Sequence, residues 1–381
     1  MKKTLTVALL ALLTASMSAQ EKKIETPAWI NNVRLSGYGM LQYQAQGKEG
    51  AKENGFQLRL ARISLDGRIA TDWYWKAQIQ FNGNTANLGS SPRVVDLFAE
   101  WQKLPFLNVK AGQFKRPFTF ENPMHPIDQG FMSYSQNVNA LAGFSDRAGA
   151  HASNGRDIGI QLQGDLLKNA SGRYILHYQV GVFNGQGINT KDVDQQKDLI
   201  GGIWVMPVKG MRIGAFGWTG SYARKGDFVE TYYYYGIQRD IIKNYMMKLQ
   251  QRRYALSAEY KFNDWTLRSE YIHSTGEAFK TRYKKESDAD DFTLSDNGDK
   301  ADGLYALCIA PIKSKKLYAK ARYDMYRANG EWNSAKTNYE VGLNYLFTKN
   351  LQINAEYALV NDRTAKKHNY NLFDVELDFR F

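Results

Sequence analysis

The last ten residues, 372–381, read LFDVELDFRF and alternate between apolar and charged side chains. Apolar residues occupy the odd positions from 373 to 381, and charged residues occupy the even positions from 374 to 380. In a β-strand, this alternation places the apolar side chains on one face and the charged side chains on the other. A tilted strand of about ten residues also spans a bilayer. The segment therefore predicts a transmembrane strand, and a large soluble β-sandwich protein is the competing interpretation.

The same alternation recurs along the chain. In the segment 73–81, for example, Trp73 and Trp75 share one face while Lys76 and Gln78 share the other. The pattern predicts an all-β fold, a closed antiparallel transmembrane barrel of about sixteen strands, which is wide enough for an aqueous channel. The candidate strands are 33–43, 57–69, 73–81, 94–101, 107–113, 156–166, 173–183, 200–207, 211–218, 253–260, 265–273, 304–311, 317–326, 338–347, 351–360 and the terminal segment.

Short turns alternate with long connections between these strands, which is typical of outer-membrane barrels. In the second strand, Phe56 and Leu58 are out of phase with Ile63, so we expect a β-bulge near Leu60. No linker or break in composition divides the chain, and a single domain is expected. The long connections are 115–155, a tyrosine-rich 220–251 and an acidic 274–300.

The amino terminus resembles a secretory signal. Lys2 and Lys3 precede a short apolar run, 5–13, and small residues follow it as far as Ala19. This run is too short for a membrane-spanning helix, so we expect cleavage after Ala19 and a barrel domain over 20–381. No later segment approaches 18 consecutive apolar residues. The 24 Tyr, 19 Phe and 8 Trp suit a barrel, because aromatic residues form its interfacial girdles.

The net charge of the chain is positive. The chain carries 50 Lys and Arg residues against 38 Asp and Glu residues, a formal charge of +12, and cleavage of the signal would leave +10. In a soluble protein this excess could indicate nucleic acid. In an exported barrel it favours anions in a pore, or lipopolysaccharide at the rim, and no nucleic-acid partner is expected. The single cysteine, Cys308, rules out an internal disulfide framework.

Charged side chains of both signs fall on the inward phase of the predicted strands. Rings of basic side chains in a pore favour anions and acidic rings favour cations, whereas ion pairs across strands would give no selectivity. The basic inward residues are Arg34, Arg62, Arg68, Lys76, Lys110, Arg173, Arg253, Arg268, Lys320 and Arg322. The acidic ones are Asp66, Asp72, Asp96, Glu100, Glu259, Glu270 and Asp324, and in the terminal strand Asp374, Glu376 and Asp378.

The sharpest motif is GQFKRPFTFE, residues 112–121. Gly112 permits close approach of another backbone, and Pro117 ends ladder pairing because it has no N–H. Lys115 and Arg116 then stand at the start of a long loop. If that loop folds inward, they lie at a constriction, where little water screens their charge. Otherwise they are two solvated charges at a strand exit.

The order of four segments resembles the phosphate-selective porin O and P family. These are NNVRLSGYGMLQY (31–43), LRLARISLDGRIATDWYWKAQIQF (58–81), VVDLFAEW (94–101) and LNVKAGQFKRPFTFEN (107–122). The resemblance implies a trimeric, anion-conducting, sixteen-stranded outer-membrane porin with the segment after Lys115 folded into the lumen as the constriction loop. It also implies that Lys115 and Arg116 are pore residues.

The chain departs from this family in one respect, since no dense set of lumen lysines and arginines stands out. We therefore expect passive diffusion of small anions, with phosphate as a candidate. Along the pathway we expect Lys115, Arg116, Lys110, Arg34, Arg62, Arg68, Lys76, Lys320 and Arg322. The alternatives are a general or sugar-permeable porin, and a non-conducting surface barrel or adhesin.

Enzymatic motifs are lacking in the sequence. The five histidines are widely spaced, and no nucleophile elbow, phosphate loop or paired-cysteine motif occurs. We expect no catalytic residues, no metal and no cofactor. The tyrosine run 232–235 could stack on sugars at the surface, although loop packing or an aromatic rim is the favoured interpretation.

Overall fold

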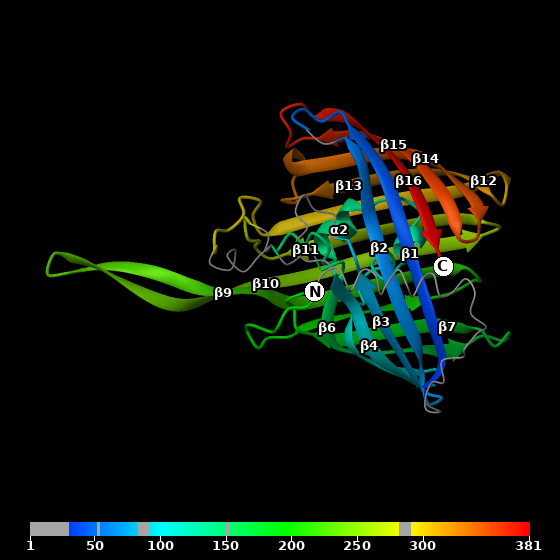
Figure 1. Cartoon of the computed structure of the whole chain (residues 1–381), viewed down its shortest axis with the longest axis horizontal. Helices are drawn as coiled ribbons and strands as arrows, with labels where there is room; N and C mark the ends of the chain where they lie inside the picture. Colours follow the sequence, from blue (N-terminus) through cyan, green and yellow to red (C-terminus); the bar gives the residue numbers. More distant parts are fainter. Residues whose placement is uncertain (1–29, 52–53, 83–91, 150–152, 282–290) are drawn as a thin grey trace, which may run out of the picture.

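The computed structural model describes residues 30–51, 54–82, 92–149, 153–281 and 291–381. Sixteen antiparallel strands, each paired with its neighbours in sequence, close into a barrel, as the alternation predicts (Figure 1). They are β1 (Ile30–Gln46), β2 (Gly55–Ile69), β3 (Trp73–Gln80), β4 (Arg93–Leu104), β5 (Leu107–Lys115), β6 (Arg156–Lys168), β7 (Tyr174–Phe183), β8 (Asp198–Val205), β9 (Met211–Tyr234), β10 (Ile237–Phe262), β11 (Trp265–Thr275), β12 (Lys300–Ser314), β13 (Leu317–Arg327), β14 (Ala335–Thr348), β15 (Leu351–Asp362) and β16 (Asn369–Arg380). The expected signal segment, 1–19, lies outside the described residues.

The terminal segment closes the barrel. Strand β16 pairs with β15 on one side and with β1 on the other, and the backbones of Phe381 and Gly37 exchange two hydrogen bonds of 3.0 Å. A Cβ on Gly39 would lie 2.4 Å from the ring of Phe379, so only glycine leaves room for that ring. The pairing of β16 with β1, which closes the barrel, therefore depends on aromatic rings of β16 that lie over glycines of β1.

The two faces of β16 divide as the sequence predicts. Phe373 and Phe379 are 43% and 45% exposed on the outer surface, whereas Asp374 and Glu376 are 7% and 1% exposed on the inner one. Large apolar side chains are likewise exposed on the outside of the other strands. An apolar outer belt around a charged interior is the arrangement that a bilayer requires. Within the described residues, no helix is long and apolar enough to cross a membrane.

Bulges change the phase of two strands. The β1–β2 register passes from Met40↔Leu60 to Leu41↔Leu58, which confirms the bulge expected near Leu60 and turns Arg59 inward. In β4, the register shift opposite Ile79 leaves Val95 fully buried. Alternation counted from Leu97 would place Val95 on the outer face, but the bulge puts Val94 there instead, 38% exposed. Since both residues are valine, the sequence gives no sign of this bulge.

Strands β9 and β10 extend beyond the barrel as a two-stranded arm (Figure 1). Residues 220–234 and 237–251 pair only with each other, because β8 pairs with β9 up to Thr219 and β11 pairs with β10 from Arg252. The expectation of a loop over 220–251 is therefore wrong. The tyrosines stand at the tip of the arm, where Tyr233 is 72% and Tyr235 is 89% exposed, so they do not pack in a loop.

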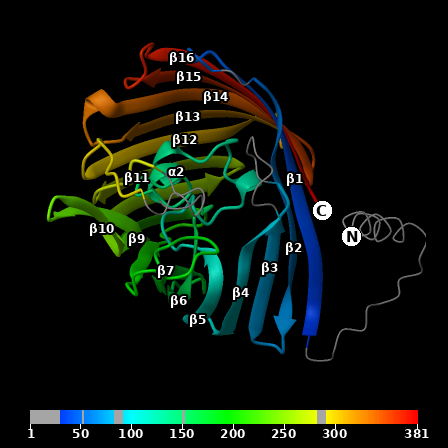
Figure 2. The ribbon, with the colours of Figure 1, turned by 60° about the vertical axis from the view of Figure 1, so that its left-hand side comes forward.

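The connection between β5 and β6 folds into the barrel, as expected, and contains the short helices η2 (Pro126–Asp128) and α2 (Gln136–Leu141) (Figure 2). Helix α2 packs against β11, β12 and β13. Strand β5 ends at Lys115, two residues before Pro117, as the motif predicts. Gly112 has φ +131°, and a Cβ there would lie 2.2 Å from the Leu97 carbonyl oxygen, so the close approach of β4 requires glycine.

Carboxylates of the barrel wall hold this inward loop. Glu270 accepts hydrogen bonds from the backbone N–H groups of Phe120 (3.0 Å) and Glu121 (2.7 Å). Asp324 accepts from the N–H of Gln136 at 3.0 Å. Because a charged acceptor forms strong hydrogen bonds in a site with little water, these contacts fix the path of the loop.

Candidate functional site

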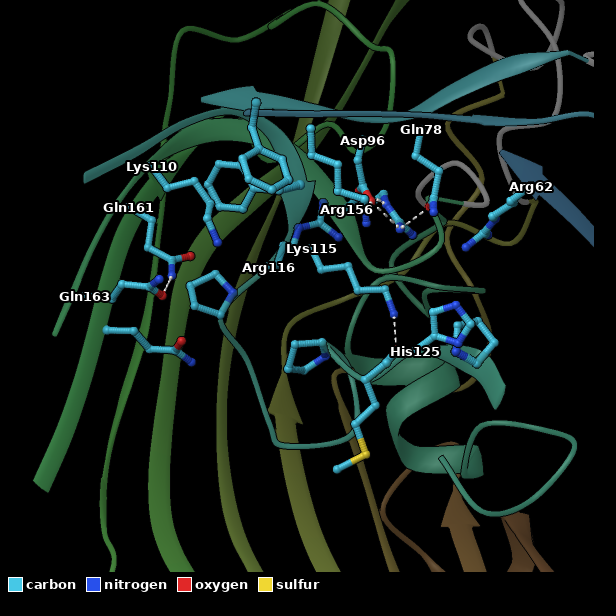
Figure 3. Close-up of a pocket in the computed structure, with 18 of the residues that line it drawn as sticks. Arg62, Gln78, Asp96, Lys110, Lys115, Arg116, His125, Arg156, Gln161 and Gln163 are labelled. Carbon is cyan, nitrogen blue, oxygen red and sulfur yellow. Dashed lines mark hydrogen bonds and ion pairs between the residues drawn. The ribbon is translucent and has the colours of Figure 1, made fainter. Parts of the chain in front are cut away.

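A cavity of about 260 Å³ lies between the inward loop and the wall formed by β1 to β7 (Figure 3). Its wall side carries most of the charge, and its loop side is formed by residues 123–126. The lining residues are Tyr38, Arg62, Lys76, Gln78, Asp96, Phe98, Lys110, Phe114, Lys115, Arg116, Pro117, Pro123, Met124, His125, Pro126, Arg156, Gln161, Gln163 and Gln179.

Positive charge exceeds negative charge at this cavity. Asp96 is shared by Arg156, whose Nε lies 2.5 Å from Oδ1, and by Lys76, whose Nζ lies 3.3 Å from Oδ2. Lys110 is paired with Glu100 at 3.5 Å. The Arg62 guanidinium donates instead to neutral oxygens, those of Gln80 and of the Tyr38 hydroxyl, at 2.8–3.0 Å. One face of the lumen therefore holds several cations around few carboxylates.

Lys115 lines the cavity, but it also holds the loop. Its Nζ donates to the carbonyl oxygens of Asn122 (2.8 Å) and Met124 (2.7 Å) and to the hydroxyl of Tyr134 (3.0 Å). Among the described residues, no carboxylate lies within ion-pair distance of this ammonium group. Lys115 thus ties the loop to the end of β5 at the point where the loop begins.

Arg116 occupies a different environment from its neighbour. Its side chain is 2% exposed, and Nη2 lies 2.8 Å from the carboxylate of Asp157, which is fully buried. Its guanidinium also stacks on Trp218 at 4.9 Å. Although the residue contributes atoms to the cavity wall, its charge is neutralised behind the loop, so its main contacts anchor the loop.

The other residues that the sequence assigned to the pathway are dispersed. Arg34 is 71% exposed and paired with Asp66 at 2.9 Å, close to the start of β1. Arg68 donates to the carbonyl of Thr71 and to Gln102, beside the β2–β3 turn. Neither residue lines the cavity between the loop and the wall.

Lys320 and Arg322 lie on the opposite wall, under the loop. Lys320 donates to Gly130 O at 3.0 Å and to Glu356 at 2.6 Å. Arg322 pairs with Glu340 and donates to Ser133 O at 2.9 Å. Their charges are compensated, and their bonds to loop carbonyls position the loop.

A second, smaller cavity lies on the other side of η2 and is acidic. Its volume is about 90 Å³, and its lining includes Asp128, Glu376 and Asp378. Asp128 is paired with Arg380 at 2.7 Å, and Glu376 with Arg59 at 3.1 Å. Pro126 lines both cavities, so η2 separates a basic region from an acidic one.

Two arginines of these regions escaped the sequence analysis. Arg59 faces inward only because of the bulge in β2. Simple alternation, counted from the inward Arg62, would place Arg59 on the outer face. Arg156 begins β6 and stands at a strand boundary, where alternation is least informative. The phase change between Leu58 and Ile63 was the sequence signal that could have indicated Arg59. The sequence carried no such signal for Arg156.

His125 is neutral at physiological pH. Burial lowers the pKa of His125 to about 4, and its Nδ1 accepts a hydrogen bond from the N–H of Ile127 at 3.2 Å. Because this pKa lies below the ordinary value, the imidazole contributes to holding the loop above about pH 6.5 and loses that contribution as the pH falls through about 4. At neutral pH it adds no charge to the cavity.

We predict that acidification adds a positive charge at His125. As the pH falls through about 4, the ratio of anion to cation permeability should rise about twofold more in the unaltered protein than in His125→Gln, since one unit charge is added. Reversal potentials recorded from pH 7 to pH 3.5 measure this difference, and carboxylates common to both proteins cancel. Superimposable curves would show that His125 does not titrate in the pathway.

The comparisons with known proteins identify the family. The family model described as Gram-negative porin matches residues 5–365. The chain belongs to the Gram-negative porin family. This match and the barrel imply the outer membrane as its location and a channel rather than an enzyme. No curated protein matches in sequence.

Solved porin structures share the fold at low sequence identity. OmpF of Salmonella typhi, in complex with daunomycin, is 14% identical with a TM-score of 0.62, and covers 92% of this chain and 98% of its own. The anion-selective porin of Comamonas acidovorans is 13% identical with a TM-score of 0.60, covering 92% and 100%. A trimer form of OmpT from Vibrio cholerae is 13% identical with a TM-score of 0.55, covering 92% and 99%.

In a porin, the end with short turns faces the periplasm and the end with long loops faces outward. The turn between β10 and β11 is short, and the arm of β9 and β10 stands at the other end of the barrel. The porin therefore carries its arm on the outer side of the membrane, and Phe381 lies near the periplasmic rim.

Among the described residues, no cluster of side chains suited to hold a metal ion occurs.

Proposed function

We propose that this porin is a passive channel that favours small anions, with phosphate as one candidate solute. The observation that supports this proposal is the composition of the basic cavity. Six basic side chains line it, and three carboxylates, Asp96, Glu100 and Asp157, pair with them; the basic residues are Arg62, Lys76, Lys110, Lys115, Arg116 and Arg156. The similarity to the anion-selective porin of Comamonas acidovorans is consistent with it.

The mechanism is electrostatic enrichment. Surplus positive charge in a narrow, water-filled passage raises the local concentration of anions and lowers that of cations. The Arg62 guanidinium contributes most, because its hydrogen-bond partners are neutral. Weak contacts to several cations in succession allow an anion to enter and also to leave. Arg34, Arg68, Lys320 and Arg322, which the sequence also assigned to the pathway, would line other parts of the lumen, where three of them are paired with carboxylates.

The proposal includes assembly and processing. We propose cleavage of the signal segment after Ala19, a barrel domain over 20–381, and a homotrimer in contact with outer-membrane lipid and lipopolysaccharide. The trimer form of the Vibrio cholerae structure supports the oligomeric state. The second candidate is a general, sugar-permeable porin, favoured by the amide side chains of Gln78, Gln161, Gln163 and Gln179 on the same wall.

The deciding measurement is the reversal potential of single channels in planar bilayers under a gradient of potassium chloride. We expect anion permeability above cation permeability, and a reduction of chloride current when phosphate is added. Cation preference would contradict the proposal. Equal permeability together with rapid swelling of liposomes in neutral sugars would favour the general porin, and no conductance would favour a non-conducting barrel.

A further inference from the structure

We propose that the basic cavity is a binding site for organic anions that carry a carboxylate on a compact apolar ring. The inference rests on the proposed anion preference and narrows its substrate class. The cavity is amphipathic, because cations line one side and uncharged, largely apolar groups line the other. Such a surface recognises a solute with one charged end and one apolar body better than a fully hydrated inorganic ion.

The loop residues that line the cavity are Pro123, Met124, His125 and Pro126, and none of them is charged at neutral pH, because burial lowers the pKa of His125 to about 4. Lys115 reaches this side from β5, where its Nζ donates to the carbonyls of Asn122 and Met124. Across the cavity stand the guanidinium of Arg62 and the Asp96-bound groups of Lys76 and Arg156. A ring anion can therefore place its carboxylate on the wall and its ring against the loop.

Aromatic rings continue the apolar surface on the wall side. The Phe98 and Phe114 rings meet edge to face with centroids 5.8 Å apart, and Lys110 Nζ lies 5.0 Å and 5.3 Å from these centroids. Tyr38 contacts His125 edge to face at 4.3 Å. Rings at these positions offer edges and faces to an aromatic solute, and edge-to-face and offset arrangements are the favoured ones.

The space and the remaining polar groups fit such a solute. A cavity needs a volume of only about 10–15 Å³ to hold one water molecule. The cavity volume of about 260 Å³ therefore accommodates a ring anion with part of its hydration shell. The amides of Gln161, Gln163 and Gln179 offer donors and acceptors without adding charge. Inorganic phosphate would use the cations but would gain nothing from Pro123, Met124 or Phe98, because apolar contact stabilises only apolar surface.

The test compares three carboxylates of equal charge that differ in their apolar body. Acetate, benzoate and cyclohexanecarboxylate are titrated against the chloride current of single channels at pH 7, with inorganic phosphate as a more highly charged anion that has no apolar body and neutral benzamide as a probe of the ring alone. We expect benzoate and cyclohexanecarboxylate to reduce the current at concentrations about tenfold lower than acetate, since part of the ring leaves water. Benzamide should bind more weakly than benzoate.

A variant localises the effect. Phe98→Ser should raise the half-blocking concentration of benzoate several-fold and leave that of acetate unchanged, whereas Tyr233→Ser, the same kind of change at the tip of the arm, should change neither. If Phe98→Ser does not fold, the series of anions on the unaltered protein decides. Benzoate binding no tighter than acetate in an anion-selective channel overturns this inference alone. Cation selectivity overturns both this inference and the proposed function.

Discussion

The double variant Arg62→Glu, Lys76→Glu is expected to change the porin from anion-preferring to cation-preferring. Arg62 has neutral hydrogen-bond partners, and Lys76 is the more exposed partner of Asp96, so both charges act on the passage. The substitutions change the local charge by four units. A unit charge about 8 Å from an ion changes its energy by about 0.5 kcal/mol in water, and salt at about 0.15 M reduces this by more than half.

The expected shift is about 1 kcal/mol for each kind of ion, with opposite signs for anions and cations. The permeability ratio should therefore change about thirtyfold, which reversal potentials in asymmetric salt measure directly. Lys225→Glu, Lys243→Glu on the arm makes the same change of net charge and should leave the ratio unchanged. A double variant in the cavity that keeps its anion preference would place the conducting path elsewhere.

Arg116→Met is expected to destabilise the protein by about 3–5 kcal/mol, because it leaves the Asp157 carboxylate buried without its cation. That carboxylate accepts from Arg116 Nη2 at 2.8 Å and from the backbone N–H groups of Ile158 (2.8 Å) and Gly185 (3.0 Å). Two neutral donors only partly compensate a buried charge. The free energy of unfolding, measured by urea titration with tryptophan fluorescence in lipid, should show the loss.

Two further variants test the cause. Asp157→Asn in the Arg116→Met background removes the unpaired charge and should recover much of the stability. Arg34→Met breaks an ion pair whose arginine is 71% exposed, and should cost less than about 1 kcal/mol. If Arg116→Met costs no more than Arg34→Met, Arg116 does not anchor the loop. Selectivity is a separate readout, and we expect it to change less than in the Arg62 and Lys76 variant.

Much of the barrel could be predicted from the sequence, because lipid on one side and water on the other impose a period of two on every strand. The inward loop after Lys115 was expected from the motif at 112–121 and the family resemblance. The arm was missed for the opposite reason. At the base of the arm, four consecutive residues, 221–224, are buried, and beyond the base both faces of the ribbon lie in water. Neither part has alternating inner and outer faces, so residues 220–251 show no alternation that would predict strands.

The distribution of charge in the site depended on the tertiary structure. The motif at 112–121 predicts Lys115 and Arg116 together at a constriction, yet Lys115 has neutral partners in the cavity and Arg116 is neutralised by Asp157, 41 residues away. Similarly, Glu270 meets the loop backbone about 150 residues away. Partners so distant in the chain are set by the path of the loop across the lumen, which the local sequence does not encode.

The terminal segment 372–381 illustrates the division. Its sequence by itself determined which side chains face lipid and which face the lumen, because a strand has two faces and the alternation is unbroken. Only the closed barrel decided that Phe379 lies over Gly39, that Glu376 pairs with Arg59, and that this acidic wall stands across η2 from the basic cavity. Those contacts join the two ends of the chain, and they exist only once the barrel closes.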